Sequence, residues 1–339
     1  MLQYFFSTDA GREGELIFRL VYHQVECKKP FRRLWISSME EKSILDGMAS
    51  LKDSANYDNL YQAAFCRQRA DWLIGINLTR LYSTMYNTTL TCGRVQTPTV
   101  QMIVAREREI KQFTPQTYYT ISACFETFKA SCKAETKQLA TQILADCNTS
   151  TAVVIKSEKQ QKTELPTPLY DLTALQRDAN RLLGYSAQQT LDYLQKLYDN
   201  KLATYPRTDS RYITKDQAES VKRLLDTLLS SGIFETLVLK NYSTENVKIS
   251  QIVNNKKVTD HHAILPTTSI TPEKFQQLPS GEKNIFLLIA YRLFSAVYLP
   301  HQYFSSKLVL DIAGYSFSAS GREDIQEGFQ FVEHELKKA

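Results

Sequence analysis

One short segment of the chain places a nucleophile beside a cation that can bind phosphate. It reads Tyr205-Pro206-Arg207-Thr208-Asp209. Proline disfavours the helical region for the residue before it, so the sequence predicts an extended Tyr205. Alternate side chains of an extended chain point the same way, which would put Tyr205, Arg207 and Asp209 on one face. A phenol can attack a phosphodiester while a guanidinium neutralises the charge that builds on the phosphoryl oxygens. Because a phenol has a pKa of about 10 in water, a nearby cation or base must help it ionise.

A second segment carries closely spaced carboxylates, Asp9-Ala-Gly-Arg-Glu13-Gly-Glu15. Residues 2–7 are expected to form a buried strand that Asp9 ends, and residues 16–24 a helix that Glu13 opens. Carboxylates at the carboxyl end of a strand stand where α/β sheets bind ligands, and hard oxygen ligands suit Mg²⁺. Asp9 and Glu13 are therefore the candidate metal ligands. The alternative, equally open on local sequence, is that Asp9 accepts loop hydrogen bonds and Glu13 and Glu15 favour a first helical turn.

A third segment, Gly93-Arg94-Val-Gln96-Thr97-Pro98, is a candidate phosphate-binding corner. Thr97 is expected as the N-cap and Pro98 as the first residue of a helix. The free N–H groups of a helix N-terminus attract phosphate, and Arg94 and Gln96 would add donors beside them. The alternative is a solvated arginine next to a helix cap.

Other basic residues are further candidates for contacts with nucleic acid. Arg67 and Arg69 precede Asp71 on an expected helix, where a solvated or ion-paired face is the alternative reading. The cluster made by residues 28–29 and 32–33 (Lys-Lys and Arg-Arg) is expected to be a solvated surface.

A fourth segment contains an adjacent histidine pair, Asp260-His261-His262-Ala-Ile-Leu-Pro. Adjacent residues of a strand face opposite sides, and no cysteine or third histidine lies near in sequence. No zinc site is therefore expected there. The chain's six cysteines include no CxxC pair, so neither a zinc ribbon nor a redox motif is predicted.

These segments together resemble type IA DNA topoisomerases, and the branch of topoisomerase III among them. Residues 205–210 resemble the active-site signature, residues 8–15 the acidic motif of the Toprim domain, and residues 92–98 the DNA-contacting GRVQ motif. Residues 260–267 resemble the histidine motif, and Leu34-Trp-Ile-Ser-Ser-Met39 resembles the topoisomerase III branch. The motifs occur in the expected order, and the resemblance runs from about residue 4 to the end of the chain.

The resemblance implies a reaction and roles for residues. Tyrosine attacks one DNA strand and forms a 5′-phosphotyrosyl link with a free 3′-OH. Another strand passes through the gap, and the 3′-OH then reseals the break without ATP. By resemblance, the catalytic residues are Tyr205, Arg207 as the arginine that stabilises phosphate, His261 as an aid to cleavage, and Glu13. His262 is expected to be secondary. The DNA-binding residues would be Gly93, Arg94, Gln96 and Thr97, with Arg67 and Arg69.

The acidic motif departs from the family pattern at one position. That pattern is Asp-x-Asp-x-Glu, and Gly11 stands at its middle position. One metal ligand is thereby lost, so the Mg²⁺ site is expected to be weak or incomplete. The family's catalytic glutamate and lysine are expected upstream of this chain, which would leave the chain starting inside Toprim.

The predicted fold is a multidomain α/β protein with mainly helical parts and a β-rich arch, which by resemblance form a ring that is incomplete at the N-terminus. The expected division is 1–56 for the end of Toprim, 57–112 for a helical DNA-binding domain, 113–162 for the first part of the arch, 163–299 for a helical domain with the tyrosine, and 300–339 for the return of the arch. Within the fourth part, a helix near 172–182 should stop at Gly184, Ser186 and Gln189 should form a capping box, and residues 285–299 should form a buried helix.

Composition narrows the class of protein and its partners. A chain of 339 residues with 43% hydrophobic and 23% charged residues is ordinary for a globular protein, and a net charge of +5 is compatible with a polyanion. The expected partner is single-stranded or negatively supercoiled DNA, with no membrane, no nucleotide cofactor and a monomeric, cytoplasmic protein. The alternative function is a single-stranded DNA-binding fragment without catalysis. A tyrosine recombinase or relaxase would need a different set of basic and histidine residues.

Overall fold

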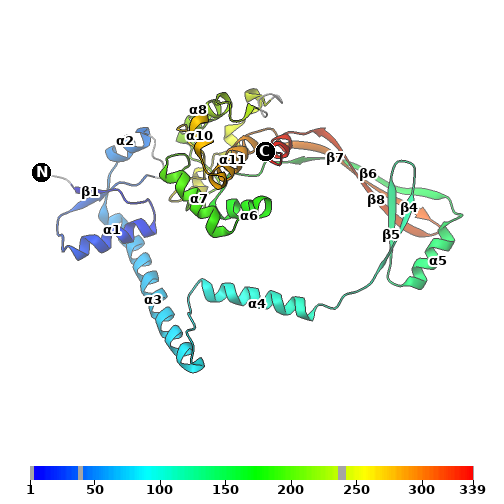
Figure 1. Cartoon of the computed structure of the whole chain (residues 1–339), viewed down its shortest axis with the longest axis horizontal. Coiled ribbons are helices and arrows are strands. Elements are labelled where there is room, and N and C mark those ends of the chain that lie inside the picture. The colour runs from blue at the N-terminus through cyan, green and yellow to red at the C-terminus, as the bar shows by residue number, and fades with distance from the viewer. Residues whose placement is uncertain (1–3, 37–40, 236–241, 339) are drawn as a thin grey trace. The chain divides into compact units, whose positions relative to one another are not determined.

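The chain forms two compact units in the computed structural model, which describes residues 4–36, 41–235 and 242–338 (Figure 1). Unit 1 contains Met1–Gln101, Thr167–Tyr298 and Val332–Ala339, and unit 2 contains Met102–Pro166 and Leu299–Phe331. The chain therefore enters unit 2 twice, before and after a long segment of unit 1. Both the five-part division and the ring remain predictions.

Unit 1 begins with a small sheet that carries the acidic motif. Strand β1 (Tyr4–Phe6) pairs in parallel with β2 (Phe31–Arg33), and β2 pairs antiparallel with β3 (Lys52–Asp53). Helix α1 (Arg12–Gln24) connects the two parallel strands, and α2 (Glu41–Ala49) and η1 (Ser54–Tyr57) follow. The predicted strand at 2–7 is present at Tyr4–Phe6, while residues 2 and 3 lie outside the described residues. Helix α1 begins four residues before the predicted start, because the turn after Asp9 already adopts helical hydrogen bonding, with Glu15 N donating to Gly11 O at 3.1 Å.

Two long helices follow this sheet. Helix α3 runs through 29 residues, Asp58–Tyr86, and ends at Asn87, whose φ of 48° is left-handed. Helix α4 is Gln96–Gln112. The prediction of Thr97 as an N-cap is wrong, because the helical turn already begins in the preceding loop. The carbonyl of Gly93 accepts from Thr97 N at 3.1 Å, and the Thr97 hydroxyl accepts from Gly93 N at 3.0 Å.

The rest of unit 1 is a helical body. Its helices are α6 (Leu172–Leu183), α7 (Ala187–Asp199), α8 (Ala218–Ser230), α10 (Pro272–Gln277), α11 (Ser280–Ala296) and the end of α12 (Gln330–Leu336), with short 3₁₀ turns η2 (Lys215–Gln217), η3 (Thr244–Asn246), η4 (Ile249–Ile252) and η5 (Asn255–Lys257). The predicted stop at Gly184 is confirmed, with φ of 72°. The capping box of Ser186 and Gln189 is also confirmed. The buried helix predicted at 285–299 is α11, which ends three residues earlier and is buried over most of its length.

Unit 2 is a five-stranded sheet with one helix against it. The strand order is β4-β5-β8-β7-β6, from β4 (Tyr119–Cys124), β5 (Lys129–Ala134), β6 (Ala152–Glu164), β7 (His301–Ile312) and β8 (Tyr315–Gln326). Helix α5 (Lys137–Cys147) covers β4 and β5. Their shared core is Ile121, Ala130, Ala134, Ile143, Leu310, Ile312 and Phe317. Strands β6 and β8 each pair with nearly the whole length of β7.

The described helices include none with the length and hydropathy needed to cross a bilayer. The branch motif at 34–39 lies partly outside the described residues, which omit 37–39.

Candidate active site

The tyrosine motif and the histidine motif lie side by side, although about fifty residues separate them in sequence. Ala203 and Pro266 form an antiparallel bridge, and Thr204 N donates to Leu265 O at 2.9 Å. Further along, the Thr208 hydroxyl donates to the backbone carbonyl of His261 at 3.1 Å. Backbone hydrogen bonds therefore fix which residue of one motif faces which residue of the other.

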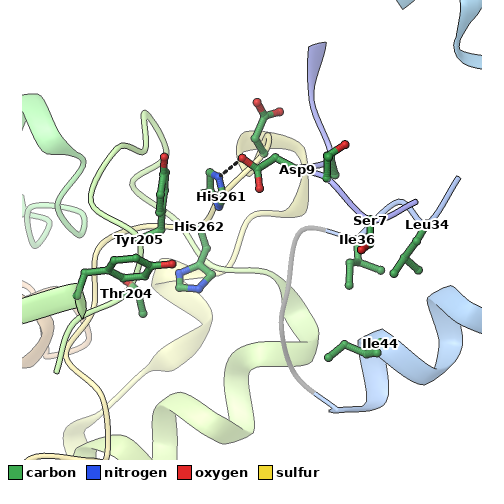
Figure 2. A pocket seen from close by; sticks show the side chains of 13 residues that line it. Ser7, Asp9, Leu34, Ile36, Ile44, Thr204, Tyr205, His261 and His262 are labelled. Atoms are coloured by element: carbon green, nitrogen blue, oxygen red, sulfur yellow. Dashed lines mark ion pairs between the residues drawn. The ribbon is translucent and has the colours of Figure 1, made fainter. Parts of the chain in front are cut away.

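The side chains of these motifs meet the acidic motif at one place (Figure 2). The ring centroids of Tyr205 and His261 are 4.2 Å apart, and the ring planes are inclined by 32°. The Nε2 atom of His261 lies 3.6 Å from a carboxylate oxygen of Asp9. Tyr198 of α7 supports Tyr205 edge-on, with centroids 5.6 Å apart. An imidazole between a phenol and a carboxylate can exchange a proton at the phenol while the carboxylate stabilises its cationic form.

Burial in the tyrosine segment alternates from residue to residue. Tyr205 is half-buried and Arg207 and Asp209 are exposed, whereas Pro206 and Thr208 between them are buried. This alternation agrees with the predicted outward face shared by Tyr205, Arg207 and Asp209. The Arg207 guanidinium has no hydrogen bond or ion pair with the rest of the described chain, and it is not among the residues that line the pocket below. Its role as the phosphate-stabilising arginine remains a prediction.

A pocket of about 500 Å³ opens at this meeting point. The residues that line it come from the acidic motif, the branch motif, α2, α7 and the two segments just described: Ser7, Thr8, Asp9, Ala10, Leu34, Ile36, Ile44, Tyr198, Thr204, Tyr205, Asp260, His261 and His262. This volume lies in the range of sites that bind drug-sized ligands. The pocket therefore has room for a small ligand beside Tyr205.

Arg33 contacts the acidic motif, and its burial differs from the sequence expectation. The basic cluster that includes Arg33 was expected to be a solvated surface, but the Arg33 side chain is fully buried. Its guanidinium donates to the backbone carbonyls of Thr8 at 2.7 Å and Asp9 at 2.5 Å, and it forms an ion pair with buried Glu15 at 3.2 Å. Burial lowers the pKa of Arg33, and the Glu15 charge opposes that shift. Arg33 therefore positions the loop from which the Asp9 side chain projects.

The other predicted residues of the acidic and GRVQ motifs join in a second charged group. Glu13 accepts from Arg67 at 2.6 Å, and it is not among the residues that line the pocket with Asp9. Asp71 lies 3.9 Å from Arg67 and accepts from Arg94 at 2.7 Å. The structure thus connects Glu13 to Arg94 through α3.

The remaining DNA-binding candidates lie outside this charged group, on α3 and at the start of α4. Arg69 is exposed on α3, and its guanidinium lies 4.3 Å from the centroid of the Phe65 ring. Gln96 is the first residue of α4 and is exposed. Gly93 and Thr97 exchange the two hydrogen bonds described for the start of α4. Their contact with DNA remains a prediction.

The pocket presents a different pair of carboxylates from the predicted pair. Asp260 lines the pocket together with Asp9. Burial, together with the charges of Asp209 and Asp9, raises the pKa of Asp260 above its ordinary value. Within the described part of the chain, no three His, Cys, Asp or Glu side chains gather as a metal site. Two carboxylates nevertheless suit Mg²⁺, which usually binds one or two of them and completes its shell with water and substrate phosphates.

Sequence reasoning missed three residues that shape this site. Arg33 was missed because a basic doublet in a sequence gives no sign of which member is buried. Asp260 was quoted as part of a motif but given no role, and Tyr198 carried no local signal. The contacts of Arg33 and Asp260 join segments that are far apart in the sequence, whereas Tyr198 contacts Tyr205 across a turn.

With this geometry in view, comparisons with known proteins assign the family. A family model described as DNA topoisomerase matches residues 55–339, so the chain belongs to the DNA topoisomerase family. The resemblance to type IA enzymes of the topoisomerase III kind is thereby confirmed. This family generally uses Mg²⁺.

Relatives and a solved structure agree with this assignment. The protein named DNA topoisomerase 3 from Bacillus cereus (strain ATCC 14579) is 40% identical over 340 residues, which cover 96% of this chain and 46% of the relative. Its namesake from Bacillus subtilis (strain 168) is 38% identical over 336 residues with the same coverage. Full-length topoisomerase I from Thermotoga maritima matches with a TM-score of 0.71 at 23% identity, over 96% of this chain and 54% of that chain, which shows a shared mixed α/β fold. The chain spans about half the length of the curated relatives it matches.

Proposed function

We propose that this chain belongs to the catalytic part of a type IA DNA topoisomerase and that Tyr205 is its nucleophile. The observation that carries the proposal is the Tyr205 ring 4.2 Å from His261, which in turn lies 3.6 Å from Asp9. Three motifs that are distant in sequence converge there around one pocket.

The reaction would be a reversible transfer of a phosphodiester bond. The Tyr205 oxygen attacks phosphorus, its proton leaves, and a bond forms between the tyrosine and the 5′-phosphate. The P–O3′ bond breaks, and the 3′-oxygen takes up a proton to become a free hydroxyl. His261, whose ring contacts that of Tyr205, would hold the exchanged proton, with Asp9 stabilising the charged imidazole. The reverse attack by the 3′-hydroxyl reseals the strand, so the bond energy is conserved and no nucleotide is needed.

Other groups would stabilise the charge on phosphate. Arg207 shares the outward face of Tyr205, and its exposed guanidinium could approach a bound phosphate with two parallel hydrogen bonds. Mg²⁺ would neutralise phosphate charge when bound, and Asp9 is the predicted ligand that the pocket presents. The DNA would be single-stranded or negatively supercoiled and held through its backbone, in a monomeric protein whose units form the ring implied by the resemblance.

The alternative is a module that binds single-stranded DNA without cleaving it. One observation favours it: Arg207 is not among the residues that line the pocket. In that case the charged group of Arg67, Asp71 and Arg94 would still bind backbone phosphates.

Covalent trapping on a labelled oligonucleotide tests the proposal. The chain, produced together with the upstream Toprim residues that the resemblance predicts, is incubated with Mg²⁺ and single-stranded DNA labelled at either the 5′ or the 3′ end, and then denatured. The proposal predicts a protein adduct that keeps only the label downstream of the break. Tyr205→Phe should abolish the adduct while leaving binding nearly intact, and Tyr198→Phe, the matched control, should still form it. An adduct in the Tyr205→Phe variant would contradict the proposal, and binding without any adduct would favour the alternative.

A further inference from the structure

The glycine that breaks the acidic motif faces the carboxylate of another motif. If a Cβ atom were added to Gly11, its three nearest neighbours would be the two carboxylate oxygens and the Cγ atom of Asp260, all closer than real Cβ contacts allow. The space that a side chain at position 11 would enter is therefore already filled. What fills it is a carboxylate, the same chemical group that the family pattern expects from position 11.

The position of Asp260 in the chain explains how it reaches this place. It immediately precedes His261, whose carbonyl is bonded to Thr208 and whose ring lies between Tyr205 and Asp9. The backbone that delivers the histidine to the tyrosine thus delivers the Asp260 carboxylate to the acidic loop. On the other side, Arg33 fixes the carbonyl of Asp9 and so fixes the loop that contains Gly11.

We propose that Asp260 supplies the carboxylate that the acidic motif lacks at position 11, so that Asp9 and Asp260 together hold the divalent cation. This inference rests on the proposed function, because the cation is implied by the family. It reassigns the metal site from Asp9 and Glu13 to Asp9 and Asp260. Glu13 is then free for its ion pair with Arg67.

The proposal has a steric corollary. An aspartate at position 11 and an aspartate at position 260 compete for one space, and both carry negative charge. Asp260 ends in a short side chain that could rotate away, but it would then leave the place from which it faces Asp9. One carboxylate at this place is therefore tolerated from either position, whereas two are not.

Titration of the purified chain with Mn²⁺, followed by electron paramagnetic resonance in the absence of DNA, tests the metal assignment. Asp260→Asn keeps the shape and removes the charge, and it should weaken Mn²⁺ binding by roughly tenfold or more, because loss of even an outer-shell partner typically costs about 10–100-fold in metal affinity. Asp209→Asn is the matched control, because it removes one nearby negative charge from a side chain that bonds Thr259. It should change the affinity much less. Equal losses of Mn²⁺ affinity in both variants would overturn the proposal. The loss of any nearby negative charge would then explain the weaker binding.

Exchange of the carboxylate between the two positions tests the competition. Gly11→Asp alone should lower the melting temperature, and the double variant Gly11→Asp with Asp260→Ala should restore it and recover most of the lost Mn²⁺ affinity. Such coupling is expected only for residues in contact. Additive effects, or a double variant that binds Mn²⁺ no better than Asp260→Ala, would overturn the inference.

Neither readout requires DNA cleavage, so the two proposals can fail separately. Tyr205→Phe should bind Mn²⁺ as tightly as the unaltered chain. If Tyr205 forms no adduct but the exchange restores metal binding, the nucleophile assignment fails and the Asp260 assignment stands. If Tyr205 forms an adduct and Asp260→Asn binds Mn²⁺ normally, the reverse holds.

Discussion

Helix α3 and the helices in the body of unit 1 both contain many hydrophobic residues. The body buries these side chains, whereas α3 leaves most of them exposed. In the body, side chains such as Leu175, Leu194 and Phe286 are completely buried. In the 29 residues of α3, Ala64 is the one residue classed as buried, and Trp72 remains 63% exposed. Both regions carry residues of the proposed function, since the body holds Tyr205 and α3 holds Arg67.

The difference shows which part of the proposed site the fold itself stabilises. The body buries enough apolar surface to fix the backbone around Tyr205 and His261. Helix α3 packs against α1 near its N-terminal end, and its charged group with Arg94 consists of pairs that are about half exposed. Exposed ion pairs contribute about 0–1 kcal/mol each, so this group is weakly held. We expect a rigid nucleophile and an adaptable phosphate-binding surface.

The largest effect is expected from a buried ion pair of the body. Arg292 donates to Asp178 at 2.6 Å and to the hydroxyl of Tyr170 at 3.0 Å. Arg292→Met would remove the buried arginine partner of Asp178 and leave the exposed Arg181 as its arginine partner. Breaking a buried pair in this way typically costs about 3–5 kcal/mol of unfolding free energy. Urea unfolding of the variant and the unaltered chain measures this loss of unfolding free energy. Arg181→Met is the control, because exposed Arg181 contacts the same carboxylate at 2.9 Å and its loss should cost about 0–1 kcal/mol. Similar losses of unfolding free energy for both variants would show that the ion pair of Arg292 and Asp178 is not buried in the body.

A pair of leucines compares the two regions directly. Leu194→Ala removes a completely buried side chain of the body and should cost about 2–5 kcal/mol. Leu73→Ala removes a half-exposed side chain of α3 and should change the unfolding free energy by less than about 0.5 kcal/mol. If the α3 variant loses as much unfolding free energy as the body variant, then Leu73 is buried in solution and the contrast between a buried body and an exposed α3 is wrong.

The pH dependence of the body should follow Asp178. Burial alone would raise the pKa of Asp178, but hydrogen bonds from Tyr170 and Arg181 and the charge of Arg292 bring that pKa below its ordinary value. The folded state therefore binds fewer protons than the unfolded state, and the stabilisation is present above about pH 4 and lost as pH falls through the folded pKa. Asp178→Asn should destabilise the chain at pH 7, and the difference from the unaltered chain should shrink at about pH 3. A constant difference in urea midpoint would contradict this assignment.

The smallest effect concerns the adaptable surface. Arg94→Ala should barely change the unfolding free energy, because the ion pair that it removes, with Asp71, is exposed to solvent. It should weaken binding to all single-stranded sequences alike and lower the log–log salt slope by about 0.7, the value for one lost phosphate contact. Arg106→Ala, which removes an exposed arginine paired with Glu109, is the control and should leave the slope unchanged. An unchanged slope for Arg94→Ala would remove Arg94 from the DNA surface.

Sequence predicted the features that local rules determine. The stop at Gly184, the capping box of Ser186 and the alternation around Tyr205 each depend on residues within a few positions of one another. The sequence failed where contacts between distant segments decide the outcome. Glu13 is paired with Arg67, and Asp260 fills the place beside Gly11. No short pattern encodes either contact.

Peptide mapping of the trapped DNA adduct tests the central claim most directly. The chain, produced together with the upstream Toprim residues that the resemblance predicts, is reacted with a short single-stranded oligonucleotide, denatured, and digested with nuclease and protease before mass spectrometry. The account predicts a residual nucleotide mass on the peptide that contains Tyr205, with fragmentation locating it on that tyrosine. The same mass on a different residue, such as Tyr198, would contradict the account.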